Sequence, residues 1–267
     1  TLQYVPPELK TFWKAAIADI AATFVVYAFS PALKCSSMYD AYWSVAPIAI
    51  VFYWLLSAEE GVHPIRAGAV VFLVTWWGVR LTYNWARSWP GLHHTDWRYE
   101  IMRERAPKVW FFSDLFGIHL FPTVEVLAAL SGAWVAVSQG TNALSWIDAL
   151  ALVVTAGAIV IETVADQQLV AFAKVKKPGE IIKTGLWAYS RHPNYFGELS
   201  FWWGLYLFGL AANPGYLWTI VGPIAMSAMF LGVSIPWMDQ RSCERRPEYA
   251  DHMKRVSGLV PWFPKKA

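Results

Sequence analysis

The chain has 267 residues, of which 56% are hydrophobic and only 15% are charged, and its net charge is +3. Because soluble domains carry about 25% charged residues, this composition excludes an ordinary soluble domain and indicates an integral membrane protein. The two cysteines, Cys35 and Cys243, are too few for a disulfide scaffold.

Seven apolar segments approach the roughly 20 residues that a helix needs to cross a bilayer. The fourth segment is long, and we expect Pro122 to tilt or break it. The sixth and seventh are separated only by Asn213, Pro214 and Gly215, which is typical of a tight turn. The segments are about 12–30, 40–57, 66–85, 112–137, 146–168, 196–212 and 215–236. We therefore predict an all-α fold, a polytopic membrane helix bundle of seven transmembrane helices, in a single domain over residues 1–267.

Lysine and arginine are concentrated in alternate connections of this predicted bundle. The segments 86–111 and 169–195 and the tail after residue 236 hold most of them, whereas the segments 58–65, 138–145 and 213–214 hold none. With seven spans, the basic connections all lie on one side. The positive-inside rule then places the C-terminus in the cytoplasm and the N-terminus outside. We expect a multi-pass protein of a bacterial inner membrane or of the endoplasmic reticulum.

Ionisable residues inside apolar segments usually mark function, because they are costly in lipid. Here they recur at the predicted cytoplasmic ends of five helices, as Asp40, Arg80, Glu162 with Asp166, Asn194 with Glu198, and Asp239. The five helices therefore place these polar groups in one layer, at the predicted cytoplasmic side of the bundle. The alternative is that charges at helix ends simply reach the membrane surface, and it stays open for Arg80 and Asp239.

The densest polar group is the block from Gly185 to Glu198. Arg191 and the neighbouring basic loops suit phosphates, and Trp187, Tyr189 and Tyr195 offer faces on which a planar ring can stack. Asn194 and Glu198 can hydrogen-bond a carboxamide or a ribose. This set predicts a nucleotide-type cofactor taken from the cytoplasm. No GxGxxG or Walker A motif occurs, and His192 has no other histidine or cysteine at ligand spacing, so we expect no metal site.

The run Lys183-Thr-Gly-Leu-Trp-Ala-Tyr-Ser-Arg-His-Pro-Asn-Tyr-Phe-Gly-Glu198 resembles the C-terminal signature of the steroid 5-alpha-reductase superfamily, and is most similar to its bacterial branch of uncharacterised membrane reductases. The resemblance extends back through Arg80-Leu81 and Asp96-Trp97-Arg98-Tyr99. The signature region, 183–267, continues through Pro247-Glu248-Tyr249 and Val260-Pro261-Trp262. Asp239 and Cys243 resemble an aspartate and a cysteine of the sterol delta-14 reductases and the lamin B receptor.

The resemblance implies a bundle of membrane helices that binds NADPH from the cytoplasm and reduces a carbon–carbon double bond conjugated to a carbonyl. It implies that Asn194 and Glu198 contact the nicotinamide end, that Asp166 binds the cofactor, and that the arginines contact phosphates or ribose. The predicted cofactor-binding residues are Arg80, Arg98, Asp166, Lys183, Trp187, Tyr189, Arg191, His192, Asn194, Tyr195, Glu198 and Asp239.

The residues that would bind the substrate carbonyl depart from the family pattern. Steroid 5-alpha-reductases use a glutamate and a tyrosine, whereas the corresponding positions here hold Asp40, seven residues before Pro47, and Trp77. Tyr83 and Tyr99 are possible replacements. The predicted catalytic residues are therefore Asp40, Tyr83, Tyr99 and Glu198. For Asp40 the alternative is a helix cap, since Ser36 and Ser37 before it are typical of a loop.

These features favour an enzyme, an NADPH-dependent oxidoreductase acting on a CH–CH group. Its expected partners are a lipophilic substrate of steroid, sterol or isoprenoid type and membrane lipid, with no nucleic acid. The alternative is an S-adenosylmethionine-dependent membrane methyltransferase, because isoprenylcysteine carboxyl methyltransferases also have an Arg-His-Pro-x-Tyr-x-Gly block. Asn194, Glu198 and the lack of a paired-glutamate stretch after the last helix favour the reductase. A non-catalytic sterol-binding or scaffold protein is the third class, and the intact block disfavours it.

Overall fold

The computed structural model describes residues 4–92 and 95–265, and within this part the chain forms helices and no β-strand. The predicted all-α class is confirmed for these residues. The chain divides into two compact units, each of which is described by itself. Unit 1 comprises Thr1–Asp148 and Leu205–Gly222, and unit 2 comprises Ala149–Gly204 and Pro223–Ala267. The single domain stays a prediction.

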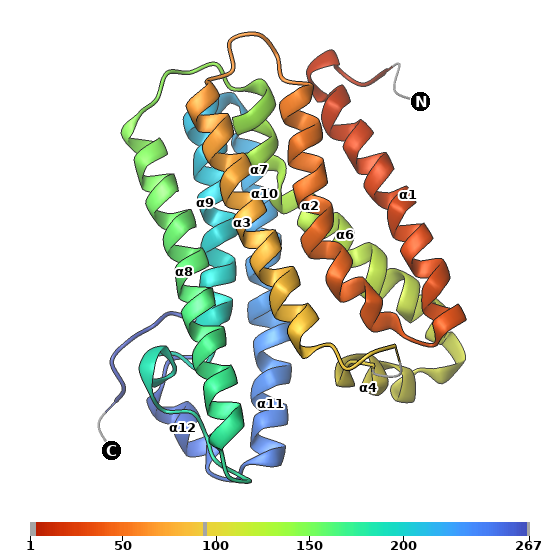
Figure 1. The fold of residues 1–267 in the computed structure, drawn as a ribbon, viewed down its shortest axis with the longest axis vertical. Coiled ribbons are helices and arrows are strands. Elements are labelled where there is room, and N and C mark those ends of the chain that lie inside the picture. The colour runs from red at the N-terminus through yellow and green to blue at the C-terminus, as the bar shows by residue number, and fades with distance from the viewer. Residues whose placement is uncertain (1–3, 93–94, 266–267) are drawn as a thin grey trace. The chain divides into compact units, whose positions relative to one another are not determined.

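Figure 1 labels the helices in chain order. They are α1 (Lys10–Leu33), α2 (Tyr39–Leu56), α3 (Pro64–Ser88), α4 (Trp97–Arg105), α5 (Trp110–Phe112), α6 (Phe121–Ala129), α7 (Ser131–Trp134), α8 (Trp146–Val175), α9 (Pro193–Ala212), α10 (Val221–Met229), α11 (Ile235–Arg245) and α12 (Tyr249–Arg255). Wider π-helical turns at Ser113–Leu120, Val135–Gln139 and Phe230–Ser234 adjoin the shorter helices. Short 3-10 turns include Gly185–Ala188 and Pro214–Ile220.

Six helical segments of the described chain are long and apolar enough to cross a membrane: Lys10–Leu33, Ser36–Leu56, Pro64–Ser88, Pro107–Ala129, Trp146–Val175 and Pro214–Arg245. They correspond to the first five predicted segments and to the seventh. The sixth predicted segment forms α9, but Asn194 and Glu198 make its first turns polar. The residues of α9 are all buried or half-buried, so other parts of the protein cover much of its surface. Seven spans and the sidedness of the termini stay predictions.

The fourth predicted segment is irregular. The π-helix Ser113–Leu120 runs directly into α6, and a turn at Leu130 separates α6 from α7. Pro122 lies in the first turn of α6, where the N–H that proline lacks would have no partner within the helix. The helix therefore changes from π to α next to Pro122, and the α-helix itself is interrupted at Leu130.

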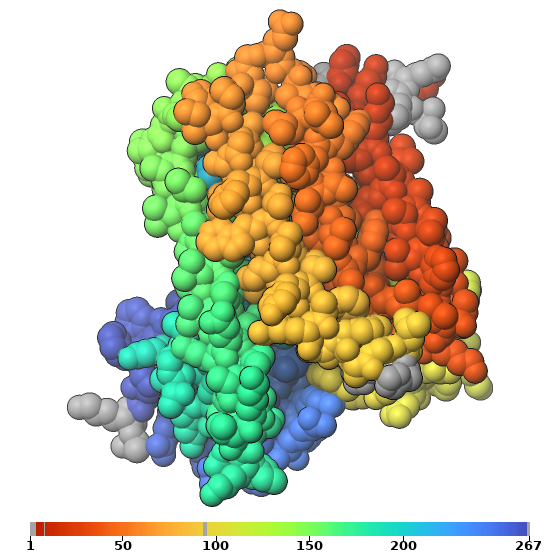
Figure 2. Space-filling view, in the orientation of Figure 1, coloured from red at the N-terminus to blue at the C-terminus, as the bar shows by residue number. Residues whose placement is uncertain are grey.

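In unit 1, α2 and α3 pack side by side, as Figure 2 shows for these orange and amber segments. Gly78 permits their close approach, because a Cβ atom there would lie 2.5 Å from the carbonyl oxygen of Ser44. The hydroxyls of Ser44 and Thr82 lie 2.8 Å apart across the contact. Elsewhere in this unit, the buried guanidinium of Arg66 binds both carboxylate oxygens of Asp148 at 2.6 and 3.0 Å.

In unit 2, α9 packs closely against α8 (Figure 1). A Cβ atom at Gly197 would lie 2.5 Å from Cγ of Glu162, and one at Gly204 would collide with the side chain of Thr155. Small residues allow two helices to approach in this way. The approach brings the start of α9 beside α8, and Asn194 Nδ2 lies 3.4 Å from Asp166 Oδ1.

Candidate functional site

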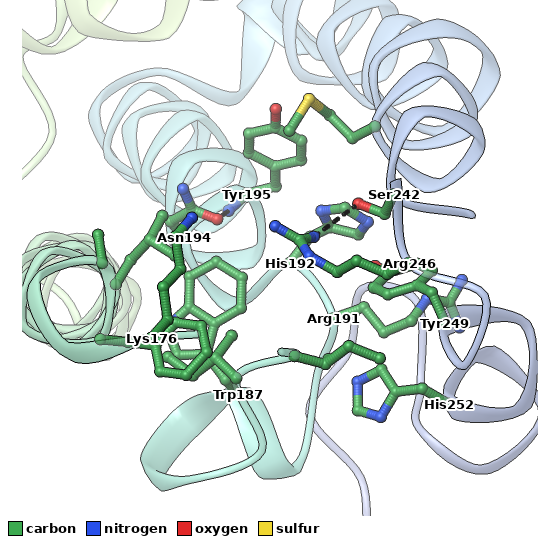
Figure 3. A pocket seen from close by; sticks show the side chains of 16 residues that line it. Lys176, Trp187, Arg191, His192, Asn194, Tyr195, Ser242, Arg246, Tyr249 and His252 are labelled. Carbon is green, nitrogen blue, oxygen red and sulfur yellow. Dashed lines mark hydrogen bonds between the residues drawn. The ribbon is translucent and has the colours of Figure 1, made fainter. Parts of the chain in front are cut away.

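A pocket of about 250 Å³ opens in unit 2 (Figure 3). Its apolar side is formed by residues such as Leu169, Phe172 and Met238. Its polar and aromatic side comes from the end of α8, the loop before α9, the start of α9, and α11 with the residues that follow it. These side chains are Lys176, Trp187, Arg191, His192, Asn194, Tyr195, Ser242, Arg246, Tyr249 and His252. The pocket therefore combines stacking faces, an amide and several cations.

The loop before α9 is held against α8 by specific contacts. The backbone N–H of Leu186 donates to Gln168 Oε1 at 3.0 Å, and Trp187 Nε1 donates to the carbonyl oxygen of Ala165 at 3.0 Å. Gly185 has φ +61°, and a side chain there would collide with Gln168. Glycine is required at this position because the left-handed backbone and the close contact both disfavour a Cβ atom. The turn places Trp187 in the wall of the pocket.

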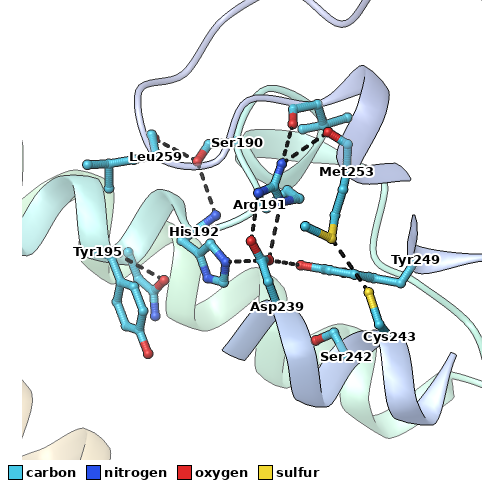
Figure 4. Close-up of polar contacts among 12 residues, drawn as sticks. Ser190, Arg191, His192, Tyr195, Asp239, Ser242, Cys243, Tyr249, Met253 and Leu259 are labelled. Carbon is cyan, nitrogen blue, oxygen red and sulfur yellow. Dashed lines mark hydrogen bonds and ion pairs between the residues drawn. The ribbon is translucent and has the colours of Figure 1, made fainter. Parts of the chain in front are cut away.

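Asp239 of α11 is the centre of a buried polar network behind the pocket (Figure 4). Its carboxylate accepts from Arg191 at 2.6 and 3.2 Å, from His192 Nε2 at 2.9 Å and from the hydroxyl of Tyr249 at 2.9 Å. Arg191 Nη1 also donates to the carbonyl oxygens of Val256 and Met253, at 2.8 and 3.2 Å. Four of the five N–H groups of this guanidinium are therefore directed at the protein. Asp239 and Arg191 hold the pocket wall in place.

Two groups beside this network have perturbed acidity. Burial and the neighbouring carboxylate of Asp239 raise the pKa of Tyr249, so its hydroxyl stays a donor. Burial, followed by the charges of Lys183 and Arg191, lowers the pKa of His252. His252 is therefore neutral near pH 7 and can accept or donate a hydrogen bond at the pocket wall.

The predicted residues of the 185–198 block divide into two groups. Trp187, Arg191, His192, Asn194 and Tyr195 line the pocket, and the ring of Tyr195 stacks on that of His192 at 5.3 Å. Glu198 is buried and accepts a hydrogen bond from Trp202 Nε1 at 2.8 Å.

The remaining predicted residues of unit 2 lie outside the pocket lining. Lys183 lies 3.9 Å from Glu248 on an exposed surface, and Tyr189 is 43% exposed. Asp166 borders the site through Asn194, and Asp239 acts from behind it. Their assigned cofactor contacts stay predictions.

The predicted catalytic residues Asp40 and Tyr99 meet in unit 1. The hydroxyl of Tyr99 donates to Asp40 Oδ1 at 2.6 Å. Asp96 caps α4 by accepting from the backbone N–H of Arg98 at 2.8 Å, and its own N–H donates to Ser37 Oγ at 2.7 Å. The contact with Ser37 and the Tyr99–Asp40 hydrogen bond fasten the start of α4 to the start of α2. Burial and the Asp40 carboxylate raise the pKa of Tyr99 well above its usual value, so the phenol keeps its proton.

Arg98, Arg80 and Tyr83 complete the predictions for unit 1. The guanidinium of Arg98 binds the carboxylate of Asp96 at 2.8 and 3.2 Å. Arg80 lies on α3, one turn before Tyr83. Tyr83 is 65% exposed, with the Arg87 guanidinium 5.8 Å from its ring centre. Of the two tyrosines considered for the carbonyl, Tyr99 is the one that contacts Asp40.

Sequence reasoning did not assign Ser242, Arg246, Tyr249 and His252 to the site. They lie on and after α11, far along the chain from the 185–198 block. Ser242 is on α11 and Arg246 directly follows it, whereas α12 folds back to bring Tyr249 and His252 to the pocket. A sequence signal existed in part, because Pro247-Glu248-Tyr249 belongs to the matching region and the tail is rich in basic residues. Lys176 lies in the basic loop that was expected to face phosphates.

Comparisons with known proteins match this chain over most of its length. The chain is 28% identical over 264 residues to an uncharacterized protein of Schizosaccharomyces pombe, covering 89% of this chain and 76% of that protein. No solved structure matches the chain. A model of a family described as proteins of unknown function, DUF1295, matches residues 26–256. This match includes both the Asp40–Tyr99 pair and the pocket of unit 2, and the chain belongs to the DUF1295 family.

Proposed function

We propose that the protein is an NADPH-dependent reductase of a carbon–carbon double bond conjugated to a carbonyl, in a lipophilic substrate of steroid, sterol or isoprenoid type. The observation that carries this proposal is the pocket of unit 2, where the aromatic and amide side chains of the 185–198 block meet Lys176, just after α8, and Arg246, just after α11. The resemblance of residues 183–198 to the steroid 5-alpha-reductase superfamily supports the same function. On this basis we propose that the chain belongs to that superfamily.

The side chains of the pocket fit one end of a dinucleotide. Trp187 and Tyr195 offer aromatic faces, Asn194 offers an amide, and Lys176 and Arg246 offer charges that suit phosphate. Among the described residues that line it, none is an aspartate or glutamate that would repel a phosphate. Its volume of about 250 Å³ lies below the roughly 300–1,000 Å³ of pockets that enclose a whole ligand. It therefore suits a ring and the adjoining phosphate.

The chemistry assigned to the protein's own residues is proton donation at the carbonyl. Bound NADPH would supply a hydride for the β-carbon of the enone. The hydroxyl of Tyr99 donates its proton to Asp40 Oδ1 at 2.6 Å, so this pair can donate a hydrogen bond to a carbonyl oxygen only when Asp40 is protonated as well. A donor of this kind stabilises the negative charge that develops on the carbonyl oxygen, and this lowers the barrier.

The test is the identity of the nucleotide that the purified protein binds. We expect an adenine dinucleotide to be retained in detergent, and NADPH to bind at least about tenfold more tightly than NADH. Saturable binding of S-adenosylmethionine without binding of NADPH would instead identify a methyltransferase. If the folded wild-type protein binds neither NADPH nor S-adenosylmethionine, the reductase has no cofactor and the proposal is refuted.

A matched pair of lysine variants locates the nucleotide. Lys176 lines the pocket, whereas Lys254 is exposed and pairs with Asp251 at 2.7 Å. Lys176→Ala should weaken NADPH binding about tenfold while Lys254→Ala leaves it unchanged, because a charge-assisted phosphate contact contributes about 1.4 kcal/mol or more. Equal affinities in the two variants would exclude this pocket as the phosphate site.

A further inference from the structure

The C-terminal segment of unit 2 carries an exposed apolar cluster. Val260, Trp262 and Phe263 are 56%, 70% and 76% exposed. Tyr189, from the loop before α9, lies beside them, with its ring centre 5.9 Å from that of Phe263. Large apolar side chains that gather on a surface mark a contact with another protein or with a membrane.

Backbone hydrogen bonds hold this cluster in place. The Arg191 N–H donates to the carbonyl oxygen of Ser257 at 2.8 Å, and the Trp262 N–H donates to that of Tyr189 at 2.9 Å. Ser190 Oγ donates to the carbonyl oxygen of Leu259 at 2.7 Å. The segment is thus fixed with its aromatic side chains outward, although their exposure to water is unfavourable. A partner that removes them from water accounts for this arrangement.

The depth of the cluster along α8 identifies the partner. α8 begins at Trp146, which is 74% exposed, and Ala165 lies about 28 Å further along the helix at 1.5 Å per residue. That length matches the roughly 30 Å of a hydrocarbon core. Trp187 donates to the carbonyl oxygen of Ala165. With the start of the hydrocarbon core set at Trp146, Tyr189, two residues after Trp187, falls near the opposite boundary between hydrocarbon and lipid headgroups. The polar residue Asp166 follows directly on α8.

The charges around the cluster agree with this depth. Lys183, Lys254, Arg255 and Lys265 are exposed on the same loop, helix and segment. Lys183 and Lys254 face the carboxylates of Glu248 and Asp251, so the attraction of this surface for anions comes mainly from Arg255 and Lys265. The Lys265 N–H donates to the carbonyl oxygen of Arg255 at 3.0 Å, which keeps the end of the segment beside α12. Aromatic residues with lysine and arginine beside them are typical of the membrane–water interface, and basic groups attract anionic lipids.

We propose that Tyr189, Val260, Trp262 and Phe263 form a membrane-interface anchor that inserts among the headgroups of anionic phospholipids. The anchor fastens the C-terminal segment to the membrane surface. Because Ser257 and Leu259 of this segment accept hydrogen bonds from Arg191 and Ser190, the Ser190–Arg191 turn is held there as well. This role is distinct from the proposed reductase activity, since Tyr189, Val260, Trp262 and Phe263 do not line the pocket.

Photolabelling tests the anchor directly. Wild-type protein in phosphatidylglycerol nanodiscs is irradiated with a phosphatidylglycerol analogue that carries a diazirine next to its glycerol, and adducts are mapped by mass spectrometry. Val175 is an internal control, because it is 78% exposed but lies about 15 Å beyond Ala165 along α8. We expect the 256–265 peptide to be labelled at least about fivefold more than the peptide holding Val175. Equal labelling of the two peptides, or labelling of neither, would overturn the proposal.

A second measurement separates lipid from a protein partner. The melting temperature of the wild type should be higher in phosphatidylglycerol than in phosphatidylcholine nanodiscs. The double variant Trp262→Ser with Phe263→Ser should lose this difference, whereas Val175→Ser should keep it. A wild-type dimer that the double variant converts to a monomer, with no lipid adduct on the 256–265 peptide, would identify a second copy of the chain as the occupant and refute the lipid anchor.

Discussion

Asp239→Asn should destabilise unit 2, because Arg191, His192 and Tyr249 all direct hydrogen bonds at its carboxylate at 2.6–3.2 Å. Asparagine keeps the shape but replaces one acceptor oxygen by an NH₂ donor, which then faces N–H and O–H groups. Asp239 is only 5% exposed, so the charge of Arg191 loses its partner in a poorly solvated place. Removing one partner of a buried ion pair costs about 3–5 kcal/mol of unfolding free energy.

The assay is the free energy of unfolding in detergent, with NADPH affinity measured on the same samples. Asp251→Asn is the matched control, because Asp251 is exposed and its ion pair with Lys254 lies at the surface; we expect no measurable change in its stability. The double variant Asp239→Asn with Arg191→Gln should recover part of the loss, since it removes both partners of the pair. If Asp239→Asn unfolds at the same denaturant concentration as Asp251→Asn, the carboxylate does not hold this wall together, and the structural role assigned to it is wrong.

Three further predictions concern other parts of the chain. Asp40→Asn should lower the turnover of an enone, measured by NADPH oxidation, at least about tenfold, and should leave NADPH affinity unchanged. If Asp40 only stabilises the start of α2, Asp40→Ser will be as active and as stable as the wild type. The pKa of His252 lies below its usual 6.5 in the folded protein. As the pH falls through 6.5, the imidazole therefore takes up a proton in the unfolded chain before it does so in the folded one, and the free energy of unfolding should decrease. His252→Gln should flatten this loss, measured by thermal midpoints between about pH 7.5 and about 5.5. Arg66→Met leaves the buried carboxylate of Asp148 without its partner and should lower the free energy of unfolding by about 3 kcal/mol or more. A melting temperature equal to that of the wild type would contradict the importance of this pair.

Local composition was sufficient to predict much of the architecture. Apolar runs of bilayer length form helices whatever their neighbours, because the backbone must satisfy its own hydrogen bonds there. The predicted segments therefore agree with α1, α2, α3 and α8 to within a few residues at most ends. The exceptions have physical causes. α8 continues past the predicted end at residue 168 to Val175, since the polar run Asp166-Gln167-Gln168 does not end the helix. The fourth segment alternates between α and π turns around Pro122.

The candidate site shows where sequence reasoning ends. The residue types of the 185–198 block were enough to predict that Trp187, Asn194 and Tyr195 gather at a polar site, because they are close in sequence to a single helix start. Whether Arg191 faces a ligand or the protein depends on Asp239, which lies 48 positions away on another helix. In the same way, Tyr249 and His252 reach the pocket only because α12 folds back toward the loop before α9.

The sequence by itself determined that the chain is a helical membrane protein and which block carries its concentrated polar groups, since both follow from hydropathy and local spacing. The tertiary structure decided which polar groups are already paired. It paired Tyr99 with Asp40 across 59 positions and Arg191 with Asp239. It also brought Lys176, Asn194 and Arg246 together at the wall of one pocket. A hydrogen bond depends on distances of about 3 Å between atoms, and only the packing of helices brings distant parts of a chain that close.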